Sequence, residues 1–339
     1  MPLTDLAATA AVSRTAAATL MVAAVCGVSA AFGAQTAAPA RACHATQYKV
    51  VELPFLPEVI SPSGVVAGID DAHRAVVWHP KTGTQPLPVP EGFHYTDAAG
   101  FTRSGAIVIN ATDARVKRHA AFIYSNKTLL PLPGRQDIVH GISPAGRIVG
   151  EWVPEGAVSS DAVYWDNQQP HSLGFCCGAS LKAANALGAL VGDAYDAQRR
   201  YHAFVWQAGQ GQRTIGPADG YSAAIAINDA GHILVQVGRE AYLDRANSLQ
   251  RLELSPRLYN AVYGINNCDF VVGGYGTDSD HYRAFLWTPA AGFQDLNALA
   301  PANSGWRLES ALAINDGGEI VGRGDHQRDD AGFLLVPQR

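Results

Sequence analysis

An internal repeat of about 42 residues constrains the fold of this chain more than any other feature. Each unit contains a glycine within a turn, which we use as its anchor, and an aspartate replaces it in one unit. The anchors are Gly64, Gly105, Gly146, Gly188, Gly231, Asp269 and Gly318. Repeats of roughly 40 to 45 residues that contain four strands are typical of the blades of a β-propeller.

Each unit predicts four short antiparallel strands, which we name a to d in chain order. Short apolar runs bounded by Gly, Asn, Asp and Pro are typical of strands joined by tight turns. Residues 224–228, 146–150, 203–206 and 127–132 illustrate strands a, b, c and d, respectively. The anchor lies in the a–b turn, where a two-residue hairpin connection needs a positive φ angle and therefore favours glycine.

The two ends of the repeat array complement each other. Residues 312–336 supply strands a, b and c of the last unit and no strand d, whereas residues 47–54 resemble a strand d with no a, b or c before it. Pairing the two would complete a seventh blade and remove two exposed sheet edges. The sequence therefore predicts an all-β, seven-bladed propeller with four antiparallel strands per blade, in which the N-terminal strand closes the last blade. An open β-solenoid of seven units is the alternative, and it would need dedicated polar caps.

The N-terminal segment differs in composition from the rest of the chain. Arg14 precedes an uncharged run, residues 15–34, that is rich in Ala and Val. A basic residue followed by an apolar run is typical of a secretory signal. We expect residues 1–42 to be such a signal with a short linker, and residues 43–339 to be a single propeller domain that is extracellular or periplasmic. An uncleaved N-terminal anchor and a lipoprotein modified at Cys26 are the alternatives, and nothing later in the sequence is expected to span a membrane.

Composition and motifs exclude several classes of function. The net charge is −5, and no cluster of Lys and Arg provides the footprint that nucleic-acid binding requires. The active-site motifs Gly-x-Ser-x-Gly and His-Glu-x-x-His and the phosphate-binding loop are absent. We expect a monomer without metal or cofactor. The acidic b–c connections, such as the one that holds Asp70 and Arg74, are expected to form local salt bridges, with calcium binding as the alternative.

Two motifs recur in register and indicate a family. His-Ala-Phe at 202–204 has a variant at 283–285, and Ala-Ile-Asn-Asp-x-Gly occurs at 226–231 and 313–318. These motifs resemble those of the HAF-type extracellular repeat, and the resemblance covers about residues 47–337. It implies a secreted bacterial protein resembling a β-propeller. It implies no catalytic residues, because the family has no established common activity.

Residues that do not repeat are the better candidates for a ligand site. In a propeller the d–a and b–c connections share one face, and strand a lines the channel. The candidates at this channel mouth are Tyr95, His94, His140, Tyr221, Tyr259, Asn260, Trp306 and Arg307. Aromatic faces and polar groups around a channel mouth suit a carbohydrate or a protein ligand. The alternative is that the tyrosines fill the top layer of the channel. His202 recurs with the repeat, so we expect it to be structural and to bond a neighbouring turn.

The cysteines permit one prediction about the ring. Cys43 precedes the N-terminal strand of blade 7, and Cys268 lies in the a–b turn of blade 6. Both turns belong to the same face, so a Cys43–Cys268 disulfide is predicted. Cys176 and Cys177 either bridge each other or remain reduced.

The isolated position of the acidic residues argues against catalysis. An enzyme that cleaves glycans needs carboxylates that converge at the channel mouth, and Asp97 and Glu309 stand alone in the sequence. We therefore expect a secreted, non-enzymatic binding or structural module with a carbohydrate or protein ligand. A propeller-fold hydrolase or lyase that acts on extracellular glycans is the alternative. A periplasmic scaffold for protein partners is a third reading that the sequence does not separate from the first.

Overall fold

The computed structural model describes most of the repeat region. It covers residues 47–338 except 103, 135–136, 154–158, 176–177, 218–219, 256–258 and 278–281. The expected signal and linker, residues 1–42, lie outside this part of the chain. The described residues belong to one compact unit. The single helix among the described residues is α1 (Leu296–Leu299), and no described helix is long and apolar enough to cross a membrane.

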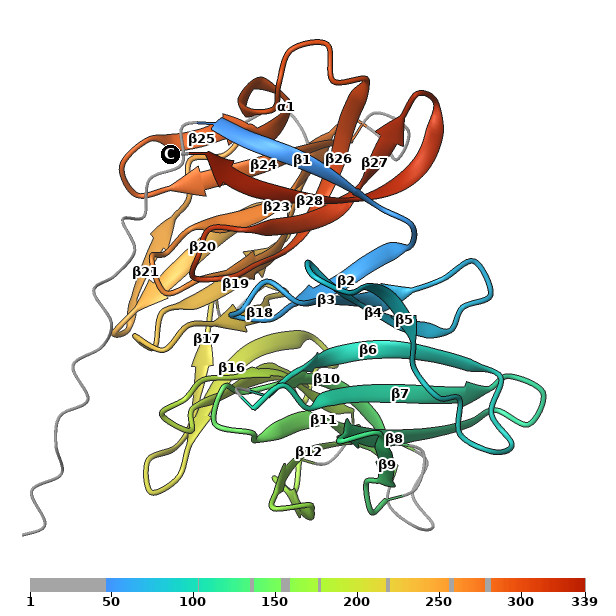
Figure 1. Cartoon of the computed structure of the whole chain (residues 1–339). Coiled ribbons are helices and arrows are strands. Elements are labelled where there is room, and N and C mark those ends of the chain that lie inside the picture. Colours follow the sequence, from blue (N-terminus) through green and yellow to red (C-terminus); the bar gives the residue numbers. More distant parts are fainter. Residues whose placement is uncertain are drawn as a thin grey trace, which may run out of the picture. The chain divides into compact units, whose positions relative to one another are not determined.

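The described strands form seven four-stranded antiparallel sheets, one for each repeat unit (Figure 1). This confirms the predicted seven-bladed propeller. Within six sheets the strands lie side by side in chain order, and the seventh contains the first strand of the chain. We number the blades 1 to 7 in the order of their anchors. The face that carries the b–c and d–a connections is called the loop face, and the face that carries the a–b and c–d connections is called the turn face.

Strands a and b of each blade are the two nearest the channel. From blade 1 to blade 7, strand a is β2 (Leu56–Ile60), β6 (Tyr95–Phe101), β10 (Ile138–Ile142), β14 (Ala179–Ala184), β18 (Ala223–Ile227), β22 (Tyr259–Ile265) and β26 (Trp306–Ile314). Strand b is β3 (Val66–Ile69), β7 (Ile107–Asp113), β11 (Ile148–Trp152), β15 (Leu190–Tyr195), β19 (Ile233–Val237), β23 (Val271–Gly276) and β27 (Ile320–His326).

Strands c and d form the outer part of each blade. Strand c is β4 (Ala75–His79), β8 (Arg118–Ser125), β12 (Asp161–Asp166), β16 (Tyr201–Gln207), β20 (Glu240–Arg245), β24 (Arg283–Thr288) and β28 (Asp329–Gln338). Strand d is β5 (Gly83–Pro86), β9 (Thr128–Pro131), β13 (Gln169–Ser172), β17 (Gly211–Ile215), β21 (Ser248–Arg251), β25 (Gly292–Asp295) and, in blade 7, β1 (Gln47–Leu53).

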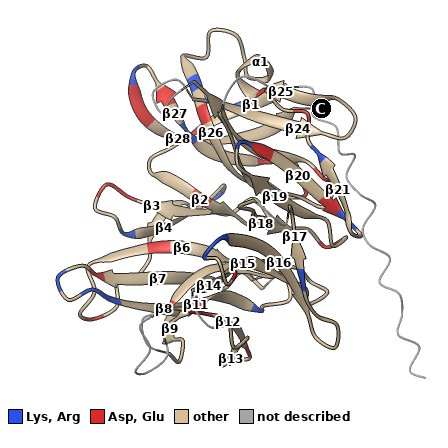
Figure 2. Ribbon diagram, turned by 180° about the vertical axis from the view of Figure 1, so that it is seen from behind, with Lys and Arg blue, Asp and Glu red and all other residues tan. Residues whose placement is uncertain are grey.

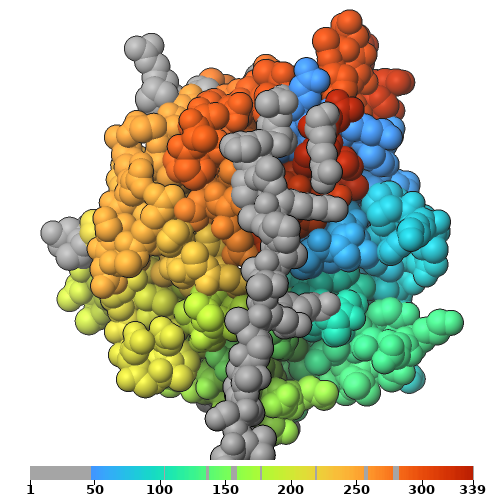
Figure 3. Space-filling view, turned by 60° about the vertical axis from the view of Figure 1, so that its left-hand side comes forward, coloured from blue at the N-terminus to red at the C-terminus, as the bar shows by residue number. Residues whose placement is uncertain are grey.

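The ring closes through the two ends of the repeat region, as predicted. Strand β1 pairs antiparallel with β28, with Gln47 opposite Gln338 and Leu53 opposite Gly332. Strand β2 of blade 1 packs against β26 and β27 of blade 7, which excludes the open solenoid. In the space-filling view the chain colours follow one another around the domain, and the N-terminal and C-terminal segments meet (Figure 3).

The core lies between neighbouring blades rather than at one centre. One apolar cluster joins Val108 and Ala121 of blade 2 to Ile148, Val163 and Trp165 of blade 3. Because each sheet face is apolar and needs a partner, every blade packs against two others. The ring therefore buries all seven pairs of faces.

Every strand a carries a β-bulge at the same place, six residues before the anchor. The extra residues of the bulges are Glu58, Ala99, His140, Lys182, Ile225, Tyr263 and Leu312. A bulge leaves one residue out of the ladder and redirects its side chain. Three of these residues, Ala99, His140 and Lys182, line the channel cavity.

In five of the seven units a second glycine lies four residues after the anchor: Gly68, Gly150, Gly192, Gly273 and Gly322. A β-carbon at Gly192 would overlap the carbonyl oxygen of Ser180, and one at Gly150 would overlap that of Ile138. Strand a therefore approaches strand b too closely for a side chain at these two glycines. Blades 2 and 5 have Ile109 and Val235 at this position, so the bulge alone does not require glycine.

The asparagine of the Ala-Ile-Asn-Asp motif bonds both its own turn and the next blade. In blade 5 the Oδ1 atom of Asn228 accepts a hydrogen bond from the backbone N–H of His232 at 3.0 Å. Its Nδ2 atom donates to the backbone carbonyl of Asn266 in blade 6 at 3.2 Å. Four buried residues make both kinds of bond and form what we call the asparagine belt: Asn185, Asn228, Asn266 and Asn315.

Candidate functional site

A channel runs along the innermost strands, and all seven blades contribute to it. The cavity within it has a volume of about 320 Å³. Its lining extends from the bulge residues His140 and Lys182 to the a–b turns, where Pro62 and Asp316 lie. The bulges thus place side chains of different chemistry on one shared wall.

Six ionisable residues on the two innermost strands of neighbouring blades interact electrostatically, and we call them the channel cluster; His140 and Lys182 line the channel cavity itself. They are Glu58, Asp97, His140, Glu151, Lys182 and Asp193, from blades 1 to 4. Each carboxylate influences, or is influenced by, the charge of at least one other member of the group. In the described part of the chain, Lys and Arg are otherwise dispersed over the sheets (Figure 2).

Three acceptor side chains near the channel each bond the backbone of the next blade. Glu58 Oε2 accepts from the N–H of Ala98 at 2.8 Å, and Asp193 Oδ1 accepts from the N–H of Ala224 at 3.0 Å. In blade 2 the Oδ1 atom of Asn110 accepts from the N–H of Val139 at 2.8 Å. Each of these N–H groups belongs to the residue just before a bulge. These acceptors therefore stabilise the ring by linking each blade to the next.

Burial and neighbouring side chains shift the pKa values of these carboxyls in opposite directions. Burial raises the pKa of Glu58 to about 7, with a further contribution from the charge of Asp97. Burial also raises the pKa of Asp193 to about 6, against the opposing effect of Lys182. Interaction with His140, whose Nε2 atom lies 3.7 Å from Oε1 of Glu151, holds the pKa of that carboxyl below its usual range. Near neutral pH the group thus contains both protonated and ionised carboxyls.

The sequence interpretation of Asp97 and Glu309 as isolated carboxylates is wrong. Asp97 Oδ1 accepts a hydrogen bond from Asn110 at 2.8 Å, and its charge affects Glu58 across the blade interface. Glu309 forms a salt bridge with Arg307 at 2.6 Å. Carboxylates that are far apart in sequence do meet on this channel wall.

A pocket on the loop face connects the channel cluster to an exposed tyrosine. The pocket lies between blades 1 and 2 and has a volume of about 500 Å³. It is lined by Glu58, Ile69, His73, Tyr95, Thr96 and Asp97. Tyr95 was predicted as a ligand residue, and its side chain here lies beside two carboxylates. We call this feature the loop-face pocket.

The other predicted tyrosines also lie at the loop face. Tyr259 is the first residue of β22, and Tyr221 precedes β18 by two residues. The exposed fractions of Tyr95, Tyr221 and Tyr259 are 45%, 63% and 44%. Three tyrosines that the sequence analysis did not nominate, Tyr195, Tyr201 and Tyr263, are also exposed. By strand direction, all six lie on this face or along the channel.

Tyr259 and the remaining candidates have protein partners that contact their polar or aromatic groups. Arg239 donates to the hydroxyl of Tyr259 at 2.6 Å, and its guanidinium lies 4.0 Å from the centre of that ring. His94 bonds Arg115 at 2.8 Å, and Asn260 donates to the carbonyl of Ser255 at 2.9 Å. Trp306 stacks on His326 with a ring distance of 4.7 Å. Arg307 bonds Asp325 as well as Glu309. His140 is the candidate that lines the channel itself.

Two structural expectations are confirmed. His202 Nε2 lies 3.0 Å from Oδ2 of Asp196, so the motif histidine bonds the b–c connection of its own blade. Asp70 and Arg74 form the expected local salt bridge at 2.7 Å. Within the described residues, no group of three or more His, Cys, Asp or Glu side chains is arranged to hold a metal ion.

The disulfide prediction is tested for one of its two residues. Cys268 is disulfide-bonded. Its predicted partner, Cys43, lies outside the described residues, as do Cys176 and Cys177. The pairing therefore stays a prediction.

A comparison of sequence columns could have found the channel cluster. In the repeat alignment, Glu58, His140 and Lys182 share the column six residues before the anchor, where other blades have Ala, Ile, Tyr or Leu. Glu151 and Asp193 share the column five residues after it. Charged residues in columns that are uncharged in most blades were the available signal.

Comparison with solved structures places the chain among propeller proteins. Virginiamycin B lyase from Staphylococcus aureus matches with a TM-score of 0.54 and 10% identity over 86% of this chain and 100% of that one. The β-propeller domain of the Trilobed protease from Pyrococcus furiosus matches with a TM-score of 0.56 and 9% identity, covering 85% and 95% of the two chains. A puromycin-hydrolyzing peptidase from Mycobacterium tuberculosis matches with a TM-score of 0.55 and 14% identity, covering 89% of this chain and 53% of that chain. No family model and no curated protein matches. At these identities the similarity shows the fold alone.

Proposed function

We propose that this protein is an exported, non-enzymatic binding module that recognises a carbohydrate at the loop-face pocket. The observation that carries the proposal is the position of exposed Tyr95 beside the carboxylates of Glu58 and Asp97 in one pocket. The apolar run at residues 15–34 and the resemblance to HAF-type repeats support the extracellular or periplasmic location.

The chemistry of the pocket matches the two surfaces of a sugar ring. The aromatic face of Tyr95 can pack against the C–H groups of a pyranose, and its hydroxyl can bond at the rim. The carboxyl oxygens of Glu58 and Asp97 can accept hydrogen bonds from sugar hydroxyls. Since the cluster holds four carboxyls and one lysine, a neutral or amino sugar suits it better than an acidic glycan.

The other exposed tyrosines make a longer ligand the better fit. Tyr221 and Tyr259 lie on blades 5 and 6, away from the blade 1–2 pocket. A single sugar cannot contact all of them. We therefore propose an oligosaccharide that enters the pocket with one unit and contacts the loop face with others.

Binding to neutral, amino and acidic oligosaccharides by isothermal titration calorimetry tests the proposal. We expect Tyr95→Ala to weaken binding about tenfold, because aromatic packing contributes about 1 kcal/mol or more. The matched control is Tyr124→Ala. Tyr124 lies near the end of β8, strand c of blade 2, at the turn face and therefore away from the pocket. Unchanged affinity in Tyr95→Ala, or stronger binding of acidic than of neutral glycans, would contradict the proposal. Capture of a protein partner without glycan binding would favour the scaffold reading instead.

The channel cluster favours a second candidate function, a hydrolase or lyase that acts on extracellular glycans. Catalysis of this kind needs one carboxyl that is protonated and one base that is ionised near neutral pH. Glu58 and Glu151 differ in this way, because burial raises the pKa of the former and His140 lowers that of the latter. The test is the appearance of new reducing ends when the protein is incubated with a bound glycan. Turnover that Glu151→Gln abolishes would replace the non-enzymatic proposal.

A further inference from the structure

The opposite end of the channel contains a second pocket with a different chemistry. The channel cavity and a neighbouring cavity of about 230 Å³ share six lining residues at the turn face. They are Pro62, Phe101, Pro144, Asp229, Asn267 and Asp316. We call this site the turn-face pocket. Its apolar residues come from blades 1 to 3, and its polar residues come from blades 5 to 7.

On the polar side of the pocket, one neutral amide group donates hydrogen bonds to two carboxylates. The Nδ2 atom of Asn267 donates to Oδ2 of Asp316 at 2.8 Å and to Oδ2 of Asp229 at 3.3 Å. The three residues occupy the same turn position, two residues before the anchor. Neither aspartate forms a salt bridge in the part of the chain that the structure describes. A cation placed between them would offset their mutual repulsion.

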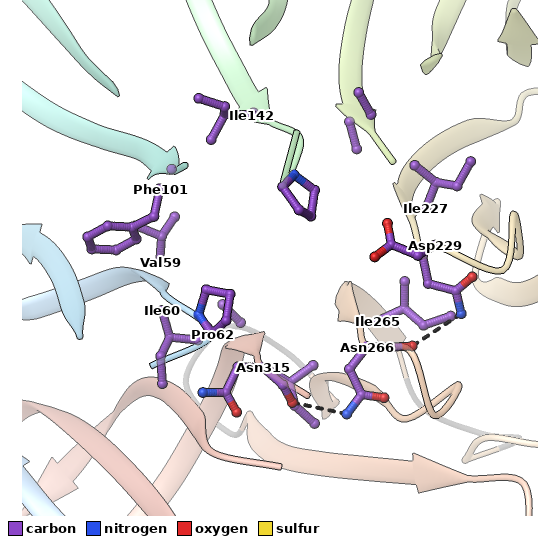
Figure 4. A pocket seen from close by; sticks show the side chains of 18 of the residues that line it. Val59, Ile60, Pro62, Phe101, Ile142, Ile227, Asp229, Ile265, Asn266 and Asn315 are labelled. Atoms are coloured by element: carbon purple, nitrogen blue, oxygen red, sulfur yellow. Dashed lines mark hydrogen bonds between the residues drawn. The ribbon is translucent and has the colours of Figure 1, made fainter. Parts of the chain in front are cut away.

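The apolar side faces these carboxylates across the cavity. In Figure 4, Val59, Phe101 and Ile142 lie on one side, and the carboxylate of Asp229 points into the cavity from the other. A bare metal ion would gain little here, because it needs several oxygen ligands and no metal-binding group occurs among the described residues. The cavity volumes are at the lower end of the range for ligand pockets and therefore select a small molecule.

From this arrangement we propose that the turn-face pocket binds a small organic ammonium ion with an apolar body. The ammonium group lies between Asp229 and Asp316, and the apolar body packs against Phe101 and the two prolines. The site is at the other end of the channel from the loop-face pocket. It therefore stands or falls independently of the carbohydrate proposal.

The experiment compares three molecules that share one body and differ in charge. Phenethylammonium, 2-phenylethanol and 3-phenylpropionate are titrated into the full-length protein and followed by ligand-observed NMR. We expect phenethylammonium to bind about tenfold more tightly than the alcohol, because it gains an ion pair with a partly desolvated carboxylate. The propionate is expected not to bind. Equal binding of all three, or no binding of phenethylammonium at millimolar concentration, would overturn the proposal.

Conservative variants locate the binding. Asp229→Asn and Asp316→Asn keep an oxygen that can accept the N–H groups of Ala186 and Asn267, so the turns are expected to stay folded. Each is expected to weaken phenethylammonium binding about fivefold without changing that of the alcohol. Asp71→Asn, at an exposed b–c connection, is the matched control. Unaltered affinity in both pocket variants, with unaltered circular dichroism, rules the site out.

A further variant addresses the turn position of blade 2. Arg103 has the same place in the repeat as Asp229 and lies outside the described residues. Arg103→Ala removes a positive charge from this turn position of the sequence, so it is expected to leave phenethylammonium binding equal or stronger. Loss of binding in this variant would count against a site that selects cations. Tyr95→Ala, which tests the carbohydrate proposal, is expected to have no effect on phenethylammonium.

Discussion

Blades 1 to 3 and blades 4 to 7 close their a–b turns differently. In blades 1 to 3 the turn begins with Ser61, Thr102 or Ser143, and each hydroxyl accepts a backbone N–H of its own turn at 2.9 to 3.0 Å. In blades 4 to 7 the asparagine belt makes the same bond and adds a second one to the next blade. The asparagine side chain is longer than that of serine or threonine and carries an N–H donor. It can therefore bond its own turn and the next blade at the same time.

The belt adds links at the turn face to blades 4 to 7, which also share the kind of bond nearer the loop face that Asp193 makes with Ala224. Blades 1 to 3 lack the belt, and their links to the next blade include Glu58 to Ala98 and Asn110 to Val139, nearer the loop face. The last bond of the belt, from Asn315 to the carbonyl of Ser61, crosses the ring closure at 3.0 Å. Where the belt is absent, the turn face presents prolines and Phe101, and the turn-face pocket opens beside them.

The largest expected effect is the loss of stability when the disulfide of Cys268, in blade 6, is removed. Cys268→Ser is expected to lower the free energy of unfolding by about 4 kcal/mol, because a disulfide restricts the unfolded chain. Thermal unfolding measures the change. If Cys43 is the partner, Cys43→Ser produces the same loss, and reductant lowers the Tm of the wild type but not of either variant. A Cys43→Ser variant with the Tm of the wild type would assign the bond to another cysteine.

A smaller effect separates the two kinds of turn directly. Asn228→Ala leaves the N–H of His232 and the carbonyl of Asn266 without their buried partner, so we expect a loss of about 3 kcal/mol. Ser143→Ala removes one turn bond and is expected to cost about 1 kcal/mol. Asn228→Ser keeps the turn bond and is expected to fall between them. Equal losses in Asn228→Ala and Ser143→Ala, measured by chemical denaturation, would show that the link between blades contributes nothing.

A further effect is a pH dependence that Glu58 of blade 1 is expected to produce. Burial raises the pKa of Glu58 from 4.5 to about 7, so the folded state binds a proton that the unfolded state has lost within this range. Stability is therefore expected to fall as the pH rises through this window, and the cost is complete above about pH 7. Glu58→Gln keeps an acceptor for the N–H of Ala98 and removes the ionisation. Its Tm relative to wild type is expected to increase between about pH 5 and pH 8, whereas the reverse trend would contradict burial as the cause. The same substitution at exposed Glu91 is the matched control.

The architecture was predictable because the same turn residues and apolar strand residues recur in each repeat. The positive-φ anchors, the second glycine and the complementary ends indicated blades, and the pairing of β1 with β28 follows from them. The loop-face tyrosines were also predictable, since Tyr95 and Tyr259 begin strands at a known distance from an anchor. What remained hidden was the bulge, because a redirected side chain leaves no periodicity in the sequence.

The channel cluster was not predicted, for a physical reason. Glu58 and Asp97 lie in different repeats and at different columns, and they meet only because a bulge turns one toward the channel. The sequence showed Asp97 as a lone acid, whereas in the structure its charge influences Glu58. Contacts between blades depend on the closed ring, which local patterns do not describe.

The pairing of β1 with β28 has a consequence for how the protein is made. The outermost strand of blade 7 is synthesised first, and its three partners are synthesised last. The domain cannot complete its last sheet until β28 has been synthesised, so its most distant contact forms after all the other blades have been made. A circular permutant that joins Gln338 to Gln47 and opens between two other blades would assemble that sheet from one continuous segment. Such a permutant would free the final folding step from its dependence on the first residues of the domain.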